Sequence, residues 1–166
     1  WFSLSAYAMG PEHFVAVFDN ITERKAAEEA LVDGRERFRA VAQTANDAII
    51  TIDDQGLVTF WNKAAEDLFS WTSQEMLGRP VTDIIPLRFR QAHLDGLQRV
   101  ATTGESSIIG TTTEVVGLRR DGREFPMELS LSTWRISAGA QFFTALGRDI
   151  STRKAHEAEL RKAGRI

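Results

Sequence analysis

An internal repeat constrains this chain more than any other feature of its sequence. Residues 20–31 return as residues 149–160 without a gap, so that Ile21 corresponds to Ile150 at an offset of 129 residues. The residues that recur unchanged are Ile21, Arg24, Lys25, Ala26, Glu28 and Leu31, which become Ile150, Arg153, Lys154, Ala155, Glu157 and Leu160. The same offset relates Gly10, Phe14 and Ala16 to Gly139, Phe143 and Ala145, ahead of the helix-forming segment. Such a repeat indicates two copies of one structural joint.

The repeat divides the chain into four parts. Residues 1–19 are predicted to be the C-terminal hairpin of a preceding, incomplete module, and residues 20–45 are predicted to be a connector helix. Residues 46–150 are predicted to form one complete domain, and residues 151–166 form the helix by which the chain leaves it. A chain of 166 residues can hold one domain of this size together with such attachments.

Composition and charge exclude several classes of function. The net charge is only −3, with both signs interspersed, which argues against nucleic acid and against direct contact with a membrane. The sequence has no cysteine, so disulfides, thiolate metal sites and a chromophore attached to cysteine are excluded. It also has no glycine-rich phosphate loop and no convincing pair of catalytic carboxylates. We therefore expect a cytoplasmic sensory or interaction domain rather than an enzyme.

The connector helices carry a pattern that favours dimerisation. Each is predicted to begin at a hydroxyl residue, Thr22 or Ser151, whose side chain can cap the first helical turn. In the first connector, apolar and small residues are spaced alternately by four and three positions. They are Ala27, Leu31, Gly34, Phe38, Val41 and Ala45. This heptad spacing is typical of paired helices, so we expect a homodimer whose seam includes Ala27, Leu31, Phe38 and Val41. The alternative is a helix that packs its apolar stripe on its own domain.

After residue 46 the sequence changes from a helical to a strand period. Strands are predicted at residues 48–53, 57–61, 107–119, 123–136 and 141–149, with a tight turn at Asp121-Gly122. Between the second and third strands, Asn62 and Thr72 are predicted to cap short helices, and a longer helix is predicted over residues 87–101. This order predicts an α+β domain with a five-stranded antiparallel sheet, helices over one face and an apolar pocket between them.

Five patches of the sequence resemble the PAS family. They are residues 47–58, 61–69, 75–78, 119–130 and 148–154, which occur in the family's order. The resemblance covers roughly residues 35–155, and the opening hairpin resembles the end of another PAS domain. It implies the PAS fold, flanked by N- and C-terminal signalling helices.

The resemblance also implies a role in signal transduction. PAS domains commonly serve as input modules of bacterial sensor histidine kinases, which act in two-component systems, and of cyclic-di-GMP enzymes. They dimerise through flanking helices and pass signals along them. We therefore expect a dimeric module that relays a ligand or conformational signal to neighbouring PAS and output domains of the same polypeptide. We also expect the module to bind a small-molecule ligand. The alternative is a structural relay module that binds no ligand.

His93 carries a more specific resemblance. It follows Pro86 and Arg90 in a Pro-x-x-x-Arg-x-x-His segment similar to that of the haem-binding PAS oxygen sensors of rhizobial nitrogen-fixation kinases. This resemblance implies that His93 is the axial ligand of a haem b iron. It also implies cofactor contacts for the four residues Ile108, Thr113, Leu129 and Leu131. At position 113 the sequence departs from those sensors, which carry an arginine twenty residues after the histidine.

Two alternatives to haem stay open. Many PAS domains without haem carry a histidine on the same helix as a packed or half-exposed residue. Trp61 and Trp71 flank the first pair of helices and suggest walls for a flavin, although large apolar residues at helical spacing usually belong to the core.

Overall fold

The computed structural model describes residues 1–164, and the chain forms two compact units that divide between Val41 and Ala42. The first unit contains β1 (Phe2–Gly10), β2 (His13–Asn20) and most of α1 (Thr22–Thr44). The second contains the last residues of α1 and all later elements. Each unit is described by itself.

The hairpin of β1 and β2 has the strand pairing of the last two strands of the second unit. Those strands are β6 (Glu124–Arg135) and β7 (Gln141–Asp149), in which Leu129 pairs with Gly147. In the hairpin, Leu4 pairs with Phe18, which corresponds to Gly147 in the repeat. Leu4 therefore corresponds to Leu129, and the first turn is shorter than the second. The repeat thus extends into both strands, although the ungapped offset holds only for the second of them.

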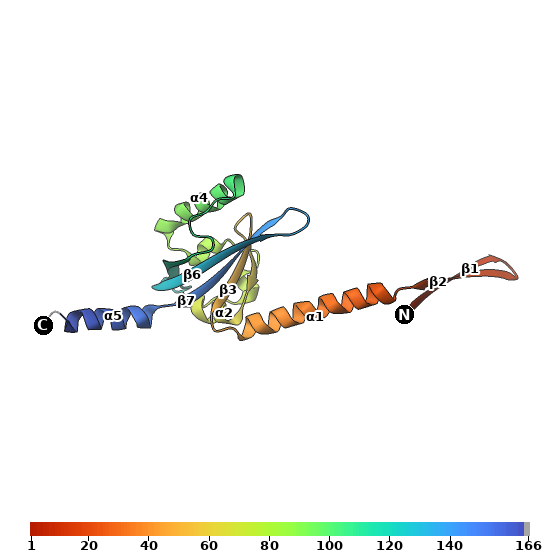
Figure 1. Ribbon diagram of the computed structural model, residues 1–166, viewed down its shortest axis with the longest axis horizontal. Coiled ribbons are helices and arrows are strands. Elements are labelled where there is room, and N and C mark those ends of the chain that lie inside the picture. The colour runs from red at the N-terminus through yellow and green to blue at the C-terminus, as the bar shows by residue number, and fades with distance from the viewer. Residues whose placement is uncertain (165–166) are drawn as a thin grey trace. The chain divides into compact units, whose positions relative to one another are not determined.

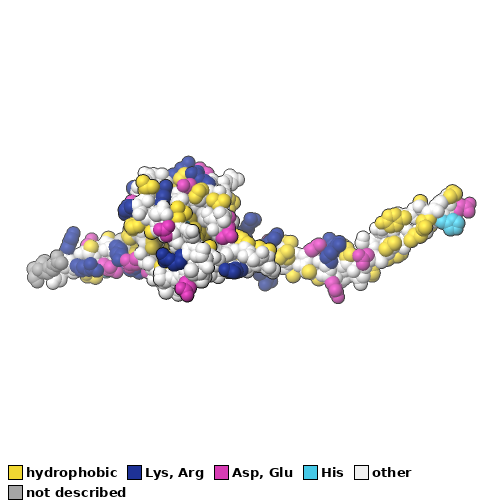
Figure 2. All heavy atoms as spheres, turned by 90° about the horizontal axis from the view of Figure 1, so that it is seen from above, with side chains coloured by type: hydrophobic (Ala, Val, Ile, Leu, Met, Phe, Trp, Pro, Cys, Tyr) yellow, Lys and Arg dark blue, Asp and Glu magenta, His cyan; other side chains and the backbone are white. Residues whose placement is uncertain are grey.

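The hairpin exposes large apolar side chains along its whole length, which Figure 2 shows in yellow. Residues with more than half of their surface exposed are Trp1, Phe2, Leu4, Tyr7, Met9, Phe14 and Phe18. A two-stranded hairpin is marginally stable in water unless a further strand or helix covers it. The equivalent strands β6 and β7 are covered in this way in the second unit, where β5 (Thr112–Leu118) and β3 (Ala48–Asp53) flank them.

The second unit is the predicted α+β domain. Its five-stranded antiparallel sheet has the order β4-β3-β7-β6-β5, with β4 at Val58–Trp61. Between β4 and β5 the chain forms α2 (Lys63–Phe69), α3 (Ser73–Met76), the 3-10 helix η1 (Val81–Ile84) and α4 (Leu87–Thr103). Helix α5 (Ser151–Ala163) follows β7 (Figure 1). The fold class predicted from the sequence is confirmed, with the core between the sheet and these helices.

Local signals explain where the helices begin and end. The Asn62 side chain accepts a hydrogen bond from the Ala65 N–H and caps α2, and Thr72 forms a capping box with Glu75 at the start of α3. Helix α4 ends at Gly104, which has a φ of 72° in the left-handed region that glycine adopts without strain. The caps at Asn62 and Thr72 were predicted from the sequence and are confirmed.

The caps predicted for the two connector helices are wrong, because different side chains accept the N–H groups at the helix starts. The Thr22 and Ser151 hydroxyls do not cap their helices. Instead, the Asn20 Oδ1 atom accepts the Thr22 N–H at 3.1 Å, and the Asp149 Oδ1 atom accepts the Ser151 N–H at 2.8 Å. The physical reason is that a short Asn or Asp side chain readily accepts the N–H two residues ahead. Because Asn20 and Asp149 are equivalent in the repeat, both joints are built in the same way.

The predicted strand over residues 107–119 begins five residues too early. The structure starts β5 at Thr112, because the Ser106 hydroxyl accepts the Ile108 and Ile109 N–H groups and Gly110 has a φ of 81°. The segment that precedes β5 is therefore not a regular strand, although Ile109 forms a single bridge with Leu131 of β6. In the described part of the chain, no helix has the length and apolar character needed to cross a membrane.

Candidate functional site

An apolar cavity of about 460 Å³ lies between the inner face of the sheet and the helices, including α4. Its walls come from α2, η1, α4 and four of the five strands. The lining residues are Ile50, Ile52, Phe69, Val81, Ile84, Ile85, Phe89, Ala92, His93, Ile108, Glu114, Val115, Val116, Met127, Leu129, Leu131, Phe143 and Ala145. Cavities of about 300–1,000 Å³ with mostly apolar walls and few polar groups are typical of small-molecule sites.

His93 is the most distinctive polar group of this cavity. It lies on α4 one helical turn after Phe89, beside Ala92, and all three residues line the cavity. Its Nε2 atom is buried and has no hydrogen-bond partner among the described residues. Burial lowers the pKa of the His93 imidazole below its usual value of 6.5, because the charged form is poorly solvated there. The side chain is therefore a neutral imidazole at neutral pH, with a free lone pair or N–H group on a buried nitrogen.

These properties fit an axial ligand of haem. A neutral imidazole nitrogen is a common ligand of haem iron, and haem needs only one such protein ligand together with apolar walls. Among the described residues, no three His, Asp or Glu side chains gather as the ligands of a metal ion held by protein alone.

The structure brings four of the five proposed cofactor residues to one cavity. His93, Ile108, Leu129 and Leu131 all line it. Thr113 does not border the cavity, although it pairs with Leu129 on the neighbouring strand. Trp61 and Trp71, the suggested walls of a flavin site, also lie outside the lining. Trp61 belongs to the core, where its indole N–H donates to the Trp71 carbonyl oxygen at 3.0 Å.

Sequence reasoning missed most of the remaining lining, although its signals were present. On three of the four lining strands, the residues that border the cavity alternate along the sequence, as a strand with one buried face requires. They are Ile50 and Ile52 on β3, Met127, Leu129 and Leu131 on β6, and Phe143 and Ala145 on β7. On α4, the spacing of Phe89 and His93 by four residues marks the helix face that borders the cavity.

Helix α4 borders the cavity but packs lightly on the rest of the domain. Of its residues only Val100 is buried, and Leu87 at its start is 79% exposed. The Arg88 guanidinium bonds both oxygens of Glu124 at the start of β6, which ties the beginning of α4 to the sheet. This ion pair fixes one end of the helix that carries His93.

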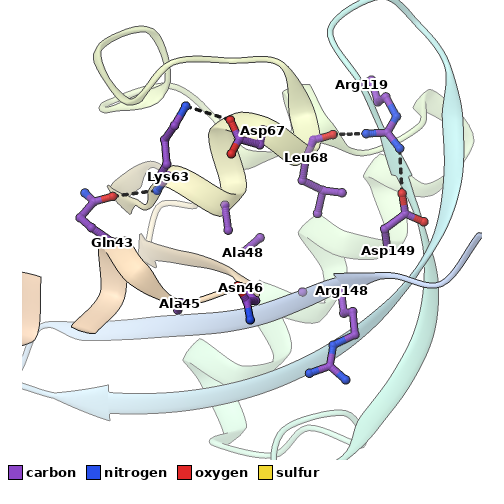
Figure 3. A pocket seen from close by; sticks show the side chains of 12 residues that line it. Gln43, Ala45, Asn46, Ala48, Lys63, Asp67, Leu68, Arg119, Arg148 and Asp149 are labelled. Atoms are coloured by element: carbon purple, nitrogen blue, oxygen red, sulfur yellow. Dashed lines mark hydrogen bonds and ion pairs between the residues drawn. The ribbon is translucent and has the colours of Figure 1, made fainter. Parts of the chain in front are cut away.

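A second hollow, shown in Figure 3, is polar and lies between α2 and the ends of β3 and β7. Its cations are paired with neighbouring groups. Lys63 bonds Asp67 at 2.8 Å, and Arg148 bonds Asp47 at 2.9 Å. Arg119 bonds Asp149 at 2.8 Å and also donates to the Leu68 carbonyl oxygen. Because these charges are satisfied within the protein, we assign this hollow no ligand.

The predicted seam residues lie on α1. Leu31, Phe38 and Val41 are 59%, 58% and 70% exposed, and Ala27 is exposed as well. This placement is compatible with helix pairing, which the single chain does not test.

Comparison with known proteins agrees with this fold. The family model described as the PAS fold matches residues 36–150. The chain is similar to "Sensor protein FixL" of Bradyrhizobium diazoefficiens, with 35% identity over 150 residues that cover 90% of this chain and 30% of that protein. It is also similar to "Cell-division control histidine kinase PdhS" of Brucella anthropi, with 27% identity over 161 residues, covering 97% of this chain and 14% of that protein. The chain thus spans less than a third of either relative.

Solved structures share the architecture. The PAS domain of an HTR-like protein from Haloarcula marismortui has a TM-score of 0.61 and 24% identity, covering 76% of this chain and 99% of that one. The PAS domain of BvgS from Bordetella pertussis has a TM-score of 0.56 and 17% identity, covering 80% and 98%. At these identities the likeness is one of fold alone.

Proposed function

The chain belongs to the PAS family, and on that premise we propose that it is a ligand-sensing relay module of a bacterial sensor histidine kinase. The coarser part of this function follows from its relatives, since it is a sensory domain homologous to parts of sensor kinases. The finer part, a ligand in the cavity whose signal passes along the flanking helices, is proposed. A cyclic-di-GMP enzyme is the alternative parent protein.

The observation that carries the proposal is the apolar cavity of about 460 Å³. Interiors of folded proteins are closely packed, and voids larger than a water molecule are few. A domain that keeps such a space beneath a lightly packed helix has room for a small molecule, and α4 can respond to what fills it.

Haem is the ligand for which a specific observation exists. The buried Nε2 atom of His93 has no partner among the described residues, and its neutral state leaves a lone pair available to a metal. Haem, when bound, would supply an iron atom able to bind a small gas molecule. His93 would hold the iron, while Ile108, Leu129 and Leu131 would exclude water from the bound gas. A PAS module without haem remains the alternative, with another apolar ligand or none.

Titration of the purified protein with haemin tests this assignment. We expect a Soret band shifted from that of free haemin, which a His93→Ala variant loses or displaces because its axial ligand is gone. His156→Ala is the matched control, since His156 is an exposed histidine on α5 and should leave the spectrum unchanged. A spectrum of free haemin in the wild type, or an identical band in His93→Ala, contradicts the haem proposal.

The hairpin supports a proposal about domain organisation. We propose that residues 1–19 complete a preceding PAS module, residues 20–45 connect it to the domain of residues 46–150, and residues 151–166 lead onward. Support comes from the pairing of β1 with β2, which repeats that of β6 with β7, and from the exposed apolar residues that a sheet of five strands would cover. The ends of the last part, residues 165–166, lie outside the described residues.

We also propose that the module is a homodimer that pairs through α1. The heptad spacing supports this arrangement, together with the exposure of Leu31 on a helix of 23 residues. Signal transmission then corresponds to a change in how such helices pair, and neighbouring domains of the same polypeptide receive it.

A further inference from the structure

Two strands that line the cavity present carboxylates on their opposite face. Val115 of β5 pairs with Met127 of β6, and both residues line the cavity. The next pair along the ladder is Glu114 with Glu128. Glu128 follows the wall residue Met127 and does not border the cavity, so its side chain points to the outer face. Glu114 borders the cavity as well, but its carboxylate bonds the same Arg153 guanidinium as Glu128 does. Like charges directly opposite each other in a sheet repel, so this pair needs cations beside it.

Helix α5 supplies those cations. The Arg153 guanidinium donates to Glu114 at 2.9 Å and to Glu128 at 3.0 Å, and the Lys154 ammonium also bonds Glu114. Hydrogen bonding from Lys154 and the charges of both cations lower the pKa of the Glu114 carboxyl. Two negative charges on the sheet therefore face two positive charges on the helix. We call these four residues the sheet–helix clamp.

Little else holds α5 on the domain. None of the residues of α5 is buried, and its first turn is anchored by the Asp149 side chain and by the Ile150 backbone. Ile150, the residue before the helix, is buried and donates its N–H to the Pro126 carbonyl oxygen at 3.1 Å. After the first turn of α5, the ion pairs of the clamp are the main contacts that hold the helix against the sheet.

Among the strands that line the cavity, β5 is the one most able to move. It is an edge strand of the sheet and pairs only with β6, whereas β6 and β7 are held from both sides. A ligand larger than the cavity of about 460 Å³ would displace this wall at the smallest cost in backbone hydrogen bonds. Any such displacement moves Glu114, because Glu114 is adjacent to the wall residue Val115 on the same strand.

We propose that the sheet–helix clamp couples the cavity to α5, so that filling the cavity displaces β5 and loosens the hold of Glu114 and Glu128 on Arg153 and Lys154. This inference rests on the proposed sensing function and specifies how it is regulated. Coupling between two sites is reciprocal for binding free energies. A ligand that loosens α5 therefore binds more tightly once the clamp is removed, by the same factor.

Hydrogen exchange of the α5 amides, residues 155–163, measures the hold directly. In the double variant Arg153→Gln, Lys154→Gln we expect these amides to exchange about threefold to fivefold faster, as the loss of exposed ion pairs implies. High salt should shrink the difference, because it screens exposed charges. The double variant Arg161→Gln, Lys162→Gln is the matched control, since it removes the same charges from the last turn of the same helix. Equal exchange in the two double variants overturns the clamp.

Haemin titration then measures the coupling. We expect haemin to speed exchange of the α5 amides in the wild type, and the Arg153→Gln, Lys154→Gln variant to bind haemin about threefold to fivefold more tightly. If haemin binds both proteins equally, the clamp holds α5 but is not coupled to the cavity, and the inference is wrong.

A cavity variant keeps the test independent of haem. Leu129→Phe adds volume from β6 into the cavity, one residue from Glu128. We expect it to speed α5 exchange as haemin does, while near-UV circular dichroism reports that the domain stays folded. If haemin fails to bind, the haem proposal is lost, and unchanged exchange in a folded Leu129→Phe protein overturns the coupling as well.

Discussion

At the scale of single residues, Asn62 joins three segments of the domain. It is fully buried, and all four of its hydrogen-bonding positions are used. The Oδ1 atom accepts the N–H groups of Ile49 at 2.8 Å and Ala65 at 3.0 Å. The Nδ2 atom donates to the carbonyl oxygens of Ala42 at 2.8 Å and Asp47 at 3.0 Å. One side chain thus links the end of α1, β3 and the start of α2.

We predict that Asn62→Ala lowers the free energy of unfolding by about 3 kcal/mol, since it removes several hydrogen bonds and leaves buried backbone groups without partners. Unfolding of the protein in urea, followed by its tryptophan fluorescence, measures this change in the free energy of unfolding. Asn46→Ala is the control, because Asn46 is exposed, and it should cost less than about 0.5 kcal/mol. Equal midpoints for the two variants would show that the network has little weight.

Sequence reasoning recovered only part of the role of Asn62. The residue was predicted as a helix cap, because Asn before a run of helix formers favours that position. Its bonds to Ala42, Asp47 and Ile49 depend on how distant segments meet, and no local pattern encodes that meeting. In the same way, the sequence selected His93, but its unpartnered and buried Nε2 atom depends on the packing of α4 over the sheet.

The burial of His93 predicts a pH dependence. Its folded-state pKa lies below the unfolded value near 6.5, so the unfolded chain binds a proton more readily. Stability is therefore fully present above about pH 6.5 and falls as the pH drops below it, by at most about 1.4 kcal/mol per pH unit.

Urea denaturation between about pH 7.5 and 5 checks this dependence, because the carboxyl groups titrate mainly below that range. We expect the wild type to lose more stability over this range than a His93→Leu variant, because leucine has no group that binds a proton. The comparison uses the slopes with pH and not the absolute stabilities, since the substitution also changes the cavity. Parallel slopes would contradict a desolvated His93.

At the scale of elements, the joint before each connector helix shows both the strength and the limit of sequence patterns. The repeat located both joints, and the strand ends at Asn20 and Asp149 agree with it. The capping atom was wrong, because the Asp149 Oδ1 atom accepts the Ser151 N–H at 2.8 Å and also the Ser151 hydroxyl, which is thereby turned away from the helix. The early start predicted for β5 failed for a similar reason, since the Ser106 side chain turns the chain before the strand.

The equivalence of Asn20 and Asp149 makes a prediction for α5. Asp149→Asn keeps an oxygen that accepts the Ser151 N–H, as Asn20 does for Thr22, and loses only the ion pair with Arg119. Asp149→Ala loses both, so we expect it to destabilise the domain by about 1–2 kcal/mol, against less than about 1 kcal/mol for Asp149→Asn. Thermal unfolding measures both. Equal losses in the two variants would show that the ion pair with Arg119 carries the effect and that the cap adds little.

At the scale of the whole molecule, the two units differ in how completely they bury their apolar residues. The second unit has a continuous core that includes Phe69, Phe125 and Phe143. The hairpin of the first unit exposes Phe2 and Phe14, although the same pairing occurs in the covered strands β6 and β7. In the described part of the chain, β1 and β2 form a sheet of their own, and this contrast supports the proposal that the hairpin belongs to another PAS module.

The seam on α1 yields the last prediction, which concerns oligomeric state. Leu31 is a seam position and is 59% exposed, and its neighbour Val32 lies off the seam and is 51% exposed. If α1 pairs with α1 of a second copy, each dimer buries two Leu31 side chains at about 2 kcal/mol each. Leu31→Glu should then weaken the dimer roughly a thousandfold, which corresponds to about 4 kcal/mol. Val32→Glu introduces the same charge beside it and should leave the dimer intact.

Light scattering over a range of protein concentrations distinguishes these outcomes, and circular dichroism shows whether each variant keeps its helices. If the wild-type protein stays monomeric at high concentration, the proposed dimer through α1 is wrong. Equal weakening by Leu31→Glu and Val32→Glu would mean that the helix associates without the predicted register. A selective effect of Leu31→Glu assigns the heptad seam to the interface, because only a helix paired in that register distinguishes two adjacent exposed apolar residues.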